Sequence, residues 1–489
     1  MEKLNKLLKY LQTIADASYI ATLMHWEMDI TAPKKSIDYL IDVKTKVELK
    51  AFELSTSKEY KQLLDDVINS DEYNKLTIEE QRYLKELSED YEKDERVPSD
   101  FFEEYSSLCS KSNAAWVEAK EKQDYQIFKP YLEKIIEMTK QYYSYRYPNT
   151  DNLYDCMLNE YEDGMTSDKI DKLFDELKRE IIPIEKNLKV TKIGELRNKY
   201  TKEELLDIAS YLLNYIGFDN ERGALGIYPH GYTCKLNNND IRITFSNNKS
   251  IFDHACTVIH EGVHGIFEQS IGENLSKYPV YDIGKYALHE SQSRFFENIL
   301  GRNINFWIPI YDELKEKLKL EIPVEDFVSY LNKPEPSFIR TQADELTYCL
   351  HIILRYEIEK DLFSGKITTA ELPTIWNKKM QEYLGIEVTN DADGILQDVH
   401  WSQGSFGYFP SYLIGSILDG MLIDAVEQNV GNIDELLKNG RIKEITKFLQ
   451  DNIHKNGGAY TIDEITKKLC NKELSVQPLV NYFKNKYSK

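Results

Sequence analysis

The stretch VIHEGVHGIFEQ, residues 258–269, decides how this sequence is interpreted. Its two histidines, His260 and His264, are four residues apart, and on a helix such residues are neighbours on one face, roughly 5–6 Å apart at Cβ. They can therefore hold one metal ion, and Glu261, directly after the first histidine, is placed to act as a general base on an attacking water. Imidazole nitrogens with an oxygen ligand suit zinc, and a catalytic zinc takes three protein ligands and keeps one position open. The motif predicts a zinc hydrolase, provided that the chain supplies a third ligand.

A third ligand has to come from residues downstream of this motif. In metzincin peptidases the motif continues as HExxHxxGxxH, but Phe267 and Ser270 occupy the glycine and third-histidine positions, which excludes that class. The remaining option is a glutamate from a following helix, and the segment KYALHESQSRFFEN (285–298) contains two. Glu290 and Glu297 are two helical turns apart, so spacing alone leaves both open.

Most of the chain has apolar residues at three- and four-residue spacing and few glycines or prolines, which predicts a mainly helical protein. Residues 232–245 depart from this rhythm, because they alternate apolar and polar residues on both sides of the turn-forming NNND cluster. That alternation predicts a β-hairpin beside the HExxH helix. We expect Arg242 and Thr244 on the face opposite the apolar set, which is Tyr232, Cys234, Leu236, Ile241, Ile243 and Phe245.

Composition and charge limit the possible partners and the compartment. The formal net charge is −21, which argues against nucleic acid or an anionic membrane as a partner. Six cysteines lie far apart without a CxxC pair, a usage typical of a reducing cytosol. The N-terminal segment lacks the apolar core of a signal peptide, and the most apolar run, residues 412–426, is interrupted by Asp419 and Asp424. We therefore expect a cytoplasmic protein without a membrane span.

Several motifs, in order along the chain, resemble one family, the thermostable (Taq-type) metallocarboxypeptidases. HESQSRFFEN (289–298) is similar to the family's third-ligand region, and DIRIT (240–244) resembles its DxRxT motif. IRTQADELTYCLHIILRYE (339–357) resembles its IRxxAD helix, and GILQDVHW (394–401) resembles its GxxQDxHW block. Weaker similarities reach both ends of the chain, among them LYDCMLNEYEDGMT (153–166). The likeness therefore covers nearly the whole sequence.

The resemblance implies a HExxH gluzincin with a mainly helical, neurolysin-like fold, a deep groove and a small β-sheet beside the HExxH helix. It implies a single catalytic domain over residues 1–489, with residues 1–200 forming a groove wall and residues 201–489 bearing the metal. It implies a homodimer that releases C-terminal amino acids from peptides with broad specificity, using one zinc ion per chain that cobalt or manganese could replace. It also selects Glu290, rather than Glu297, as the third ligand.

The family's chemistry gives roles to further residues. Zinc lowers the pKa of a coordinated water to about 7. Glu261 would accept the proton of the attacking water and deliver it to the leaving amine. The developing oxyanion needs a second donor besides the metal, and analogy with related gluzincins favours His400 and Tyr408, with Tyr412 as a further candidate in the substrate cleft.

A carboxypeptidase also needs a cation that recognises the free C-terminus of its substrate. Arginine suits a carboxylate because its planar fork binds both oxygens, and Arg340 and Arg242 are the candidates in family motifs. Asp344 and Asp398 are candidates for orienting the ligand imidazoles, since metal-binding histidines generally have such partners.

The chain departs from the family pattern at two places. Gly262 and Val263 stand in reversed order before the second histidine, which is expected to alter packing behind the helix without removing a ligand. Tyr228, Pro229 and His230 replace an HPF sequence ahead of the hairpin, which bears on substrate specificity.

Three other functions compete with the carboxypeptidase interpretation. An oligoendopeptidase of the same helical fold would cleave short peptides internally, and would cut a peptide with an amidated C-terminus equally well. An aminopeptidase is disfavoured because no GxMxN motif is present. A non-catalytic scaffold is disfavoured because Glu261 is retained together with the ligands.

Overall fold

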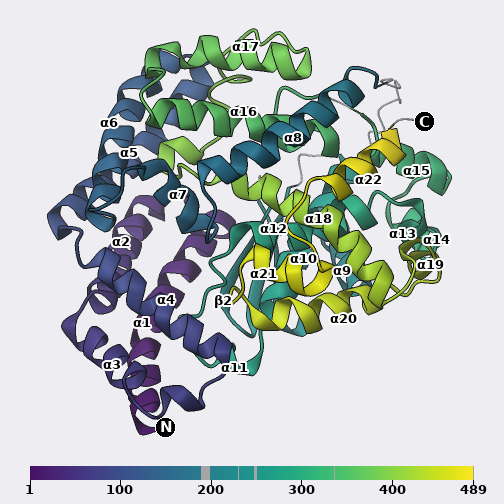
Figure 1. Ribbon diagram of the computed structural model, residues 1–489. Coiled ribbons are helices and arrows are strands. Elements are labelled where there is room, and N and C mark those ends of the chain that lie inside the picture. The colour runs from purple at the N-terminus through teal and green to yellow at the C-terminus, as the bar shows by residue number, and fades with distance from the viewer. Residues whose placement is uncertain (189–198, 229–230, 247–249, 335, 488–489) are drawn as a thin grey trace.

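The computed structural model describes residues 1–188, 199–228, 231–246, 250–334 and 336–487. The N-terminal part is helical, and in Figure 1 its first seven helices lie on the left of the molecule while the eighth crosses toward the C-terminal helices. Its helices are α1 (Glu2–Ile30), α2 (Ile37–Ser55), α3 (Lys58–Ile68), α4 (Ile78–Asp94), α5 (Ser99–Lys122), α6 (Tyr125–Arg146), α7 (Leu153–Tyr161) and α8 (Ser167–Glu185).

The middle of the chain contains the described strands and the segments of the HExxH and HESQS motifs. Its elements are α9 (Lys202–Ile216), β1 (Gly223–Ile227), β2 (Tyr232–Asn237), β3 (Asp240–Phe245), α10 (Ile251–Gln269), α11 (Glu273–Ser276), α12 (Tyr286–Arg294) and the π-helical turn η4 (Phe295–Leu300). The chain continues through α13 (Ile304–Trp307), α14 (Tyr311–Lys317), α15 (Val324–Leu331), η5 (Arg340–Gln342), α16 (Glu345–Phe363) and α17 (Leu372–Leu384). It ends with η7 (His400–Gln403), α18 (Phe409–Asn429), α19 (Ile433–Lys438), α20 (Ile442–Asn452), α21 (Ile462–Cys470) and α22 (Gln477–Tyr487). The prediction of a mainly helical fold with a small sheet is confirmed.

The sheet has three strands in the order β1-β3-β2, with β1 parallel and β2 antiparallel to β3. The predicted hairpin is therefore present, and β1 is an additional strand. One detail of the prediction was wrong, because Cys234 pairs with Arg242 and Tyr232 with Thr244. Directly paired residues point to the same face of a sheet. Arg242 and Thr244 consequently share the face of Tyr232 and Cys234.

The same register puts Thr233 opposite Ile243 and Lys235 opposite Ile241. This is the face toward α10, since the ring of Tyr232 on the other face contacts Trp26 of α1 at 6.1 Å between centroids. Polar side chains of β2 are thus directed at the HExxH helix. Residues on both faces of β2 are partly buried, so the alternation alone could not tell which face meets that helix.

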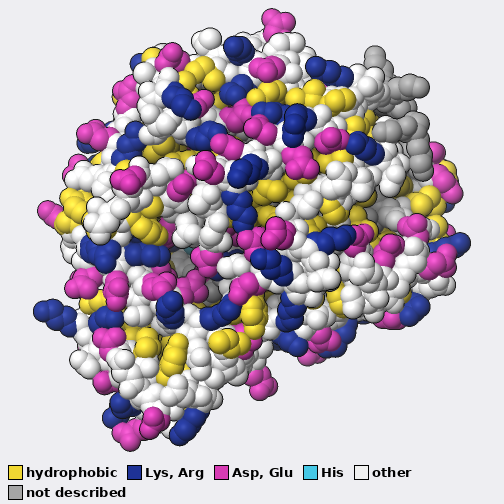
Figure 2. Space-filling model, in the orientation of Figure 1, with side chains coloured by type: hydrophobic (Ala, Val, Ile, Leu, Met, Phe, Trp, Pro, Cys, Tyr) yellow, Lys and Arg dark blue, Asp and Glu magenta, His cyan; other side chains and the backbone are white. Residues whose placement is uncertain are grey.

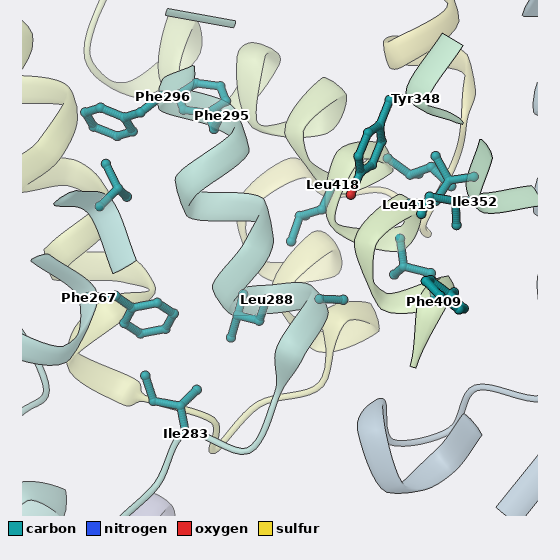
Figure 3. Packing of buried hydrophobic residues seen from close by; sticks show 14 of the residues in the cluster. Phe267, Ile283, Leu288, Phe295, Phe296, Tyr348, Ile352, Phe409, Leu413 and Leu418 are labelled. Atoms are coloured by element: carbon teal, nitrogen blue, oxygen red, sulfur yellow. The ribbon is translucent and has the colours of Figure 1, made fainter. Parts of the chain in front are cut away.

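α12 is packed between α10 and α18. A Cβ atom on Gly415 of α18 would lie 2.9 Å from the carbonyl oxygen of Ala287, so only glycine allows this close approach to α12. Figure 3 shows Leu288 lying between Phe267 and Leu413 in the surrounding apolar core. Rigid packing on both sides fixes where the side chains of α12 point.

α18 is long and apolar enough to cross a membrane by length and composition, but 83% of its most apolar window is buried inside the protein. It contacts α12, α16, α21 and α22, as expected for a core helix.

One cluster of buried apolar residues extends from Leu4 to Phe483, so both parts of the chain contribute to the same core. The division at about residue 200 into a groove wall and a catalytic part stays a prediction. Figure 2 shows acidic and basic side chains interspersed over the viewed face.

Candidate metal centre

Ser250 caps the N-terminus of α10, and its hydroxyl accepts a hydrogen bond from the Asp253 amide at 3.1 Å. Most residues of this helix are buried, because α9, α12 and the sheet all pack against it. At Gly262 an added Cβ atom would lie 2.3 Å from Leu213 Cδ2 and 2.9 Å from Ile216 Cδ1, both on α9. The order Gly262-Val263 therefore has a packing reason in this chain, and His264 remains in place beside it. Of the second departure, Pro229 and His230 lie outside the described residues.

His260, His264 and Glu290 bring three ligand atoms together within 4.8 Å of one another. The two Nε2 atoms are 3.2 Å apart, and Glu290 Oε2 lies 3.7 Å from Nε2 of His260 and 3.6 Å from Nε2 of His264. Nitrogen and oxygen ligands about 2.0–2.1 Å from a tetrahedral zinc lie roughly 3.3–3.4 Å from one another. The triangle of donors fits one such ion, with two imidazoles and one carboxylate.

Glu297 contacts the same imidazole from its other side. His260 Nδ1 donates a hydrogen bond to Glu297 Oε2 at 2.9 Å, which directs Nε2 toward the centre. Burial would raise the pKa of Glu297, but the bond from His260 outweighs it and lowers the pKa to about 2. The pKa of Glu290 is likewise lowered to about 2, so both glutamates are ionised, and they face different nitrogens of His260. Glu297 lies in η4, and a π-helical turn of this kind often marks a functional site.

His264 is held by a second chain of contacts. Its Nδ1 shares a short hydrogen bond with Nδ1 of His289, and His289 Nε2 lies 3.3 Å from Glu268 Oε1. Glu268 also pairs with Lys235 of β2 at 3.0 Å. The orientation of His264 thus rests on a histidine, a carboxylate and an ammonium group.

The structure corrects the expectation that Asp344 and Asp398 orient the ligand imidazoles. Asp344 caps α16, accepting hydrogen bonds from the amides of Leu346 and Thr347 at 2.9 Å each. Asp398 binds two arginines, Arg340 and Arg355, at 3.0 and 2.6 Å. Asp344 thus binds backbone amides of α16, and Asp398 binds arginine side chains. The groups that contact the ligand imidazoles are Glu297 and His289.

Glu261 is 8% exposed and is held by Thr233 of β2. The Thr233 hydroxyl lies 2.7 Å from Glu261 Oε2 and 2.9 Å from the Glu261 carbonyl oxygen. One carboxylate oxygen of Glu261 is thereby fixed, and the side chain lines the same cavity as the three ligands.

This cavity has a volume of about 560 Å³ and is lined by His260, Glu261, His264 and Glu290 together with Arg340, His400, Tyr408 and Tyr412. His400 Nε2 lies 3.3 Å from the Tyr412 hydroxyl, and the rings of His400 and Tyr408 are 5.4 Å apart between centroids. Burial raises the pKa of both tyrosines well above the usual value, so both keep their hydroxyl proton and can donate it in a hydrogen bond.

The candidate arginines lie in different places. Arg340 lines the cavity, with its guanidinium held by Asp398 at 3.0 and 3.1 Å and by the Tyr348 hydroxyl at 2.9 Å. Arg242 is paired with Asp240 at 2.9 Å, lies over Trp26 and is not among the residues that line the cavity. The expectation that Arg242 recognises a peptide C-terminus stays a prediction.

Residues 6–487 match the model of the family described as Carboxypeptidase Taq (M32) metallopeptidase. The chain belongs to this family. It is 37% identical to Carboxypeptidase 1 of Bacillus subtilis (strain 168), over 98% of this chain and 96% of that protein. It is 30% identical to Thermostable carboxypeptidase 1 of Pyrococcus furiosus, over 99% of this chain and 98% of that protein.

Solved structures of the M32 family share the fold. An M32 carboxypeptidase from Deinococcus radiodurans R1 superposes with a TM-score of 0.93 at 28% identity, covering 100% of this chain and 99% of that one. The Pyrococcus furiosus carboxypeptidase gives a TM-score of 0.92 at 29% identity, with the same coverage. The protein is an M32 metallocarboxypeptidase that depends on a divalent metal.

Proposed function

We propose that this M32 enzyme uses one zinc ion, bound by His260, His264 and Glu290, to release amino acids of broad specificity from the C-termini of peptides. The observation that carries the proposal is the triangle of ligand atoms beside Glu261 and Arg340 in one cavity. Two imidazoles and a carboxylate at these separations suit zinc, and cobalt or manganese could take its place.

A metal ion in this site supplies a Lewis acid that activates water and polarises the scissile carbonyl. Glu261 accepts the proton of the attacking water and passes it to the leaving amine. The contact with Thr233 holds one of its oxygens, leaving the other for this transfer. Since Glu261 follows His260 directly in α10, which also carries His264, the base and the two histidine ligands move as one rigid unit.

His400 and Tyr408 stabilise the oxyanion that develops on the scissile carbonyl. Both line the cavity, and Tyr408 keeps its proton because of burial. Preorganised donors of this kind are effective because they need no reorganisation during the reaction. Tyr412, hydrogen bonded to His400, positions that imidazole and contributes to the substrate cleft.

Arg340 reads the free C-terminus. Its guanidinium is fixed by Asp398 and by Tyr348, so little rotamer freedom is lost when a carboxylate binds. Among the described strands, β2 lies at an edge of the sheet and lines the cavity, and an extended peptide can pair with its outer edge. Backbone pairing is largely independent of side-chain identity, which supports broad specificity.

The test is mass spectrometry of one peptide with either a free or an amidated C-terminus, incubated with zinc-loaded enzyme. The proposal predicts a ladder that shortens from the free C-terminus and almost no cleavage of the amide. Internal fragments from both peptides would identify an oligoendopeptidase instead and contradict the proposal.

We also propose that the enzyme acts as a cytoplasmic homodimer on peptides, without a nucleic-acid or membrane partner. The dimer rests on the family resemblance, and light scattering of the purified enzyme tests it: a monomer mass at assay concentration would contradict it. Activity after reconstitution of metal-free enzyme with zinc, cobalt or manganese identifies the preferred ion.

A further inference from the structure

Both candidate oxyanion donors lie on one irregular segment, residues 397–408, between α17 and α18. His400 begins the short helix η7, and Tyr408 is the residue before α18. Gly404 and Gly407 turn the chain with φ angles of 76° and 85°. Because most of this segment has no regular secondary structure, the places of His400 and Tyr408 depend on contacts with its neighbours.

One carboxylate binds the segment at two points. Glu359 of α16 is fully buried, and its Oε1 accepts a hydrogen bond from Trp401 Nε1 at 2.6 Å. Its Oε2 accepts a hydrogen bond from the Gly407 amide at 2.9 Å. Trp401 follows His400 and Gly407 precedes Tyr408, so the same side chain holds the neighbours of both donors.

The third partner of Glu359 comes from the N-terminal helices. The hydroxyl of Tyr154, on α7, donates to Glu359 Oε2 at 3.0 Å. All three partners are donors, which an ionised carboxylate can accept simultaneously. Arg355, one turn earlier on α16, binds Gln397 and Asp398 instead, at 2.6 Å each. Two residues of α16 therefore hold the beginning and the end of the segment.

We propose that Glu359 is a positioning residue of the M32 reaction, which holds His400 and Tyr408 where the oxyanion forms. It acts through Trp401 and Gly407 and does not touch the substrate. The inference rests on the roles proposed above for His400 and Tyr408.

The test is the kinetics of zinc-loaded Glu359→Gln. Glutamine has the same shape, but its NH₂ group faces either Trp401 Nε1–H or the Gly407 amide, and two donors cannot bond each other. Displacement of a catalytic group by about 1 Å can cost on the order of 10²-fold in rate. We expect kcat to fall about tenfold to hundredfold, with KM and zinc content close to those of the wild type.

The matched control is Tyr154→Phe, which removes a bond from the same carboxylate but leaves both contacts with the segment. It is expected to keep kcat near the wild-type value. Should Glu359→Gln fail to fold, Trp401→Phe replaces it, because it keeps an aromatic ring and lacks the N–H group that bonds to Glu359. Equal losses of kcat in Tyr154→Phe and Glu359→Gln would overturn the inference in favour of a general packing role.

A double-mutant cycle separates positioning from stability. In a Tyr408→Phe background, Glu359→Gln should lower kcat by a smaller factor than in the wild type, because one of the groups it positions is already disabled. Equal factors in both backgrounds would overturn the inference. If His400→Ala and Tyr408→Phe both keep the wild-type kcat, their proposed roles are wrong as well. If these two variants lower kcat and Glu359→Gln does not, only the positioning role is wrong.

Discussion

Replacing Glu297 by glutamine separates the two carboxylates that meet His260. In the structure, Glu290 Oε2 faces Nε2 of both histidines, whereas Glu297 Oε2 accepts the Nδ1 proton of His260 at 2.9 Å. Glutamine at position 297 can still accept that proton, but without charge. Charge-assisted hydrogen bonds are roughly twice as strong as neutral ones, so about 1–1.5 kcal/mol is lost. This corresponds to about a tenfold weaker affinity for zinc, at the lower end of the tenfold to hundredfold cost of removing such partners.

The assay is competition for zinc between the metal-free enzyme and a chromophoric chelator. Glu290→Gln removes a ligand, so its affinity should fall much further than that of Glu297→Gln. Glu357→Gln is the control, because Glu357 forms ion pairs with Lys178 and Lys379 and does not line the cavity. Near wild-type affinity in Glu290→Gln, with a severe loss in Glu297→Gln, would refute the assignment of the third ligand.

Three further predictions concern packing, pH and substrate binding. Gly262→Ala should lower the free energy of unfolding by about 1–3 kcal/mol in urea titrations, since its Cβ would lie 2.3 Å from Leu213 Cδ2; an unchanged midpoint would contradict this. Burial raises the pKa of Glu162 from 4.5 to about 8, so between these values the unfolded chain binds fewer protons than the folded one and stability falls as pH rises. Glutamine at position 162 cannot ionise. The stability of Glu162→Gln relative to the wild type should therefore increase by up to about 1.4 kcal/mol per pH unit between pH 4.5 and about 8. A difference that does not change with pH would show that ionisation of Glu162 does not cause the pH dependence. Arg340→Lys loses the planar fork, so kcat/KM for free C-terminal peptides should fall roughly tenfold to hundredfold, and an equal loss on an amidated peptide would refute a role in reading the carboxylate.

Helical spacing and family motifs were sufficient to predict the three ligands of the candidate metal centre. His260 and His264 are neighbours on any helix, and the resemblance selected Glu290, which the structure places beside both. The partners of these ligands were not predictable in the same way. Glu297 reaches His260 because a π-helical turn follows α12, and His289 reaches His264 because α12 packs on α10.

Tertiary contacts also explain the other features of the structure that the sequence did not predict. β2 is covered on both faces, so the polar residues Thr233 and Lys235 were not recognisable as the ones directed at α10. β1 is five residues long and contains two glycines, which gives a weak strand signal. The pair between Arg340 and Asp398 joins residues 58 positions apart, and no local pattern indicates it.

Activity and zinc content of Glu261→Gln, measured on the same preparation, test the central claim most directly. Glutamine keeps the size of the side chain, and Glu261 is not one of the three ligands, so one zinc ion per chain should be retained. Removing the general base should lower kcat about 10²- to 10⁴-fold for release of the C-terminal amino acid. Wild-type kcat in the zinc-loaded variant would contradict the account.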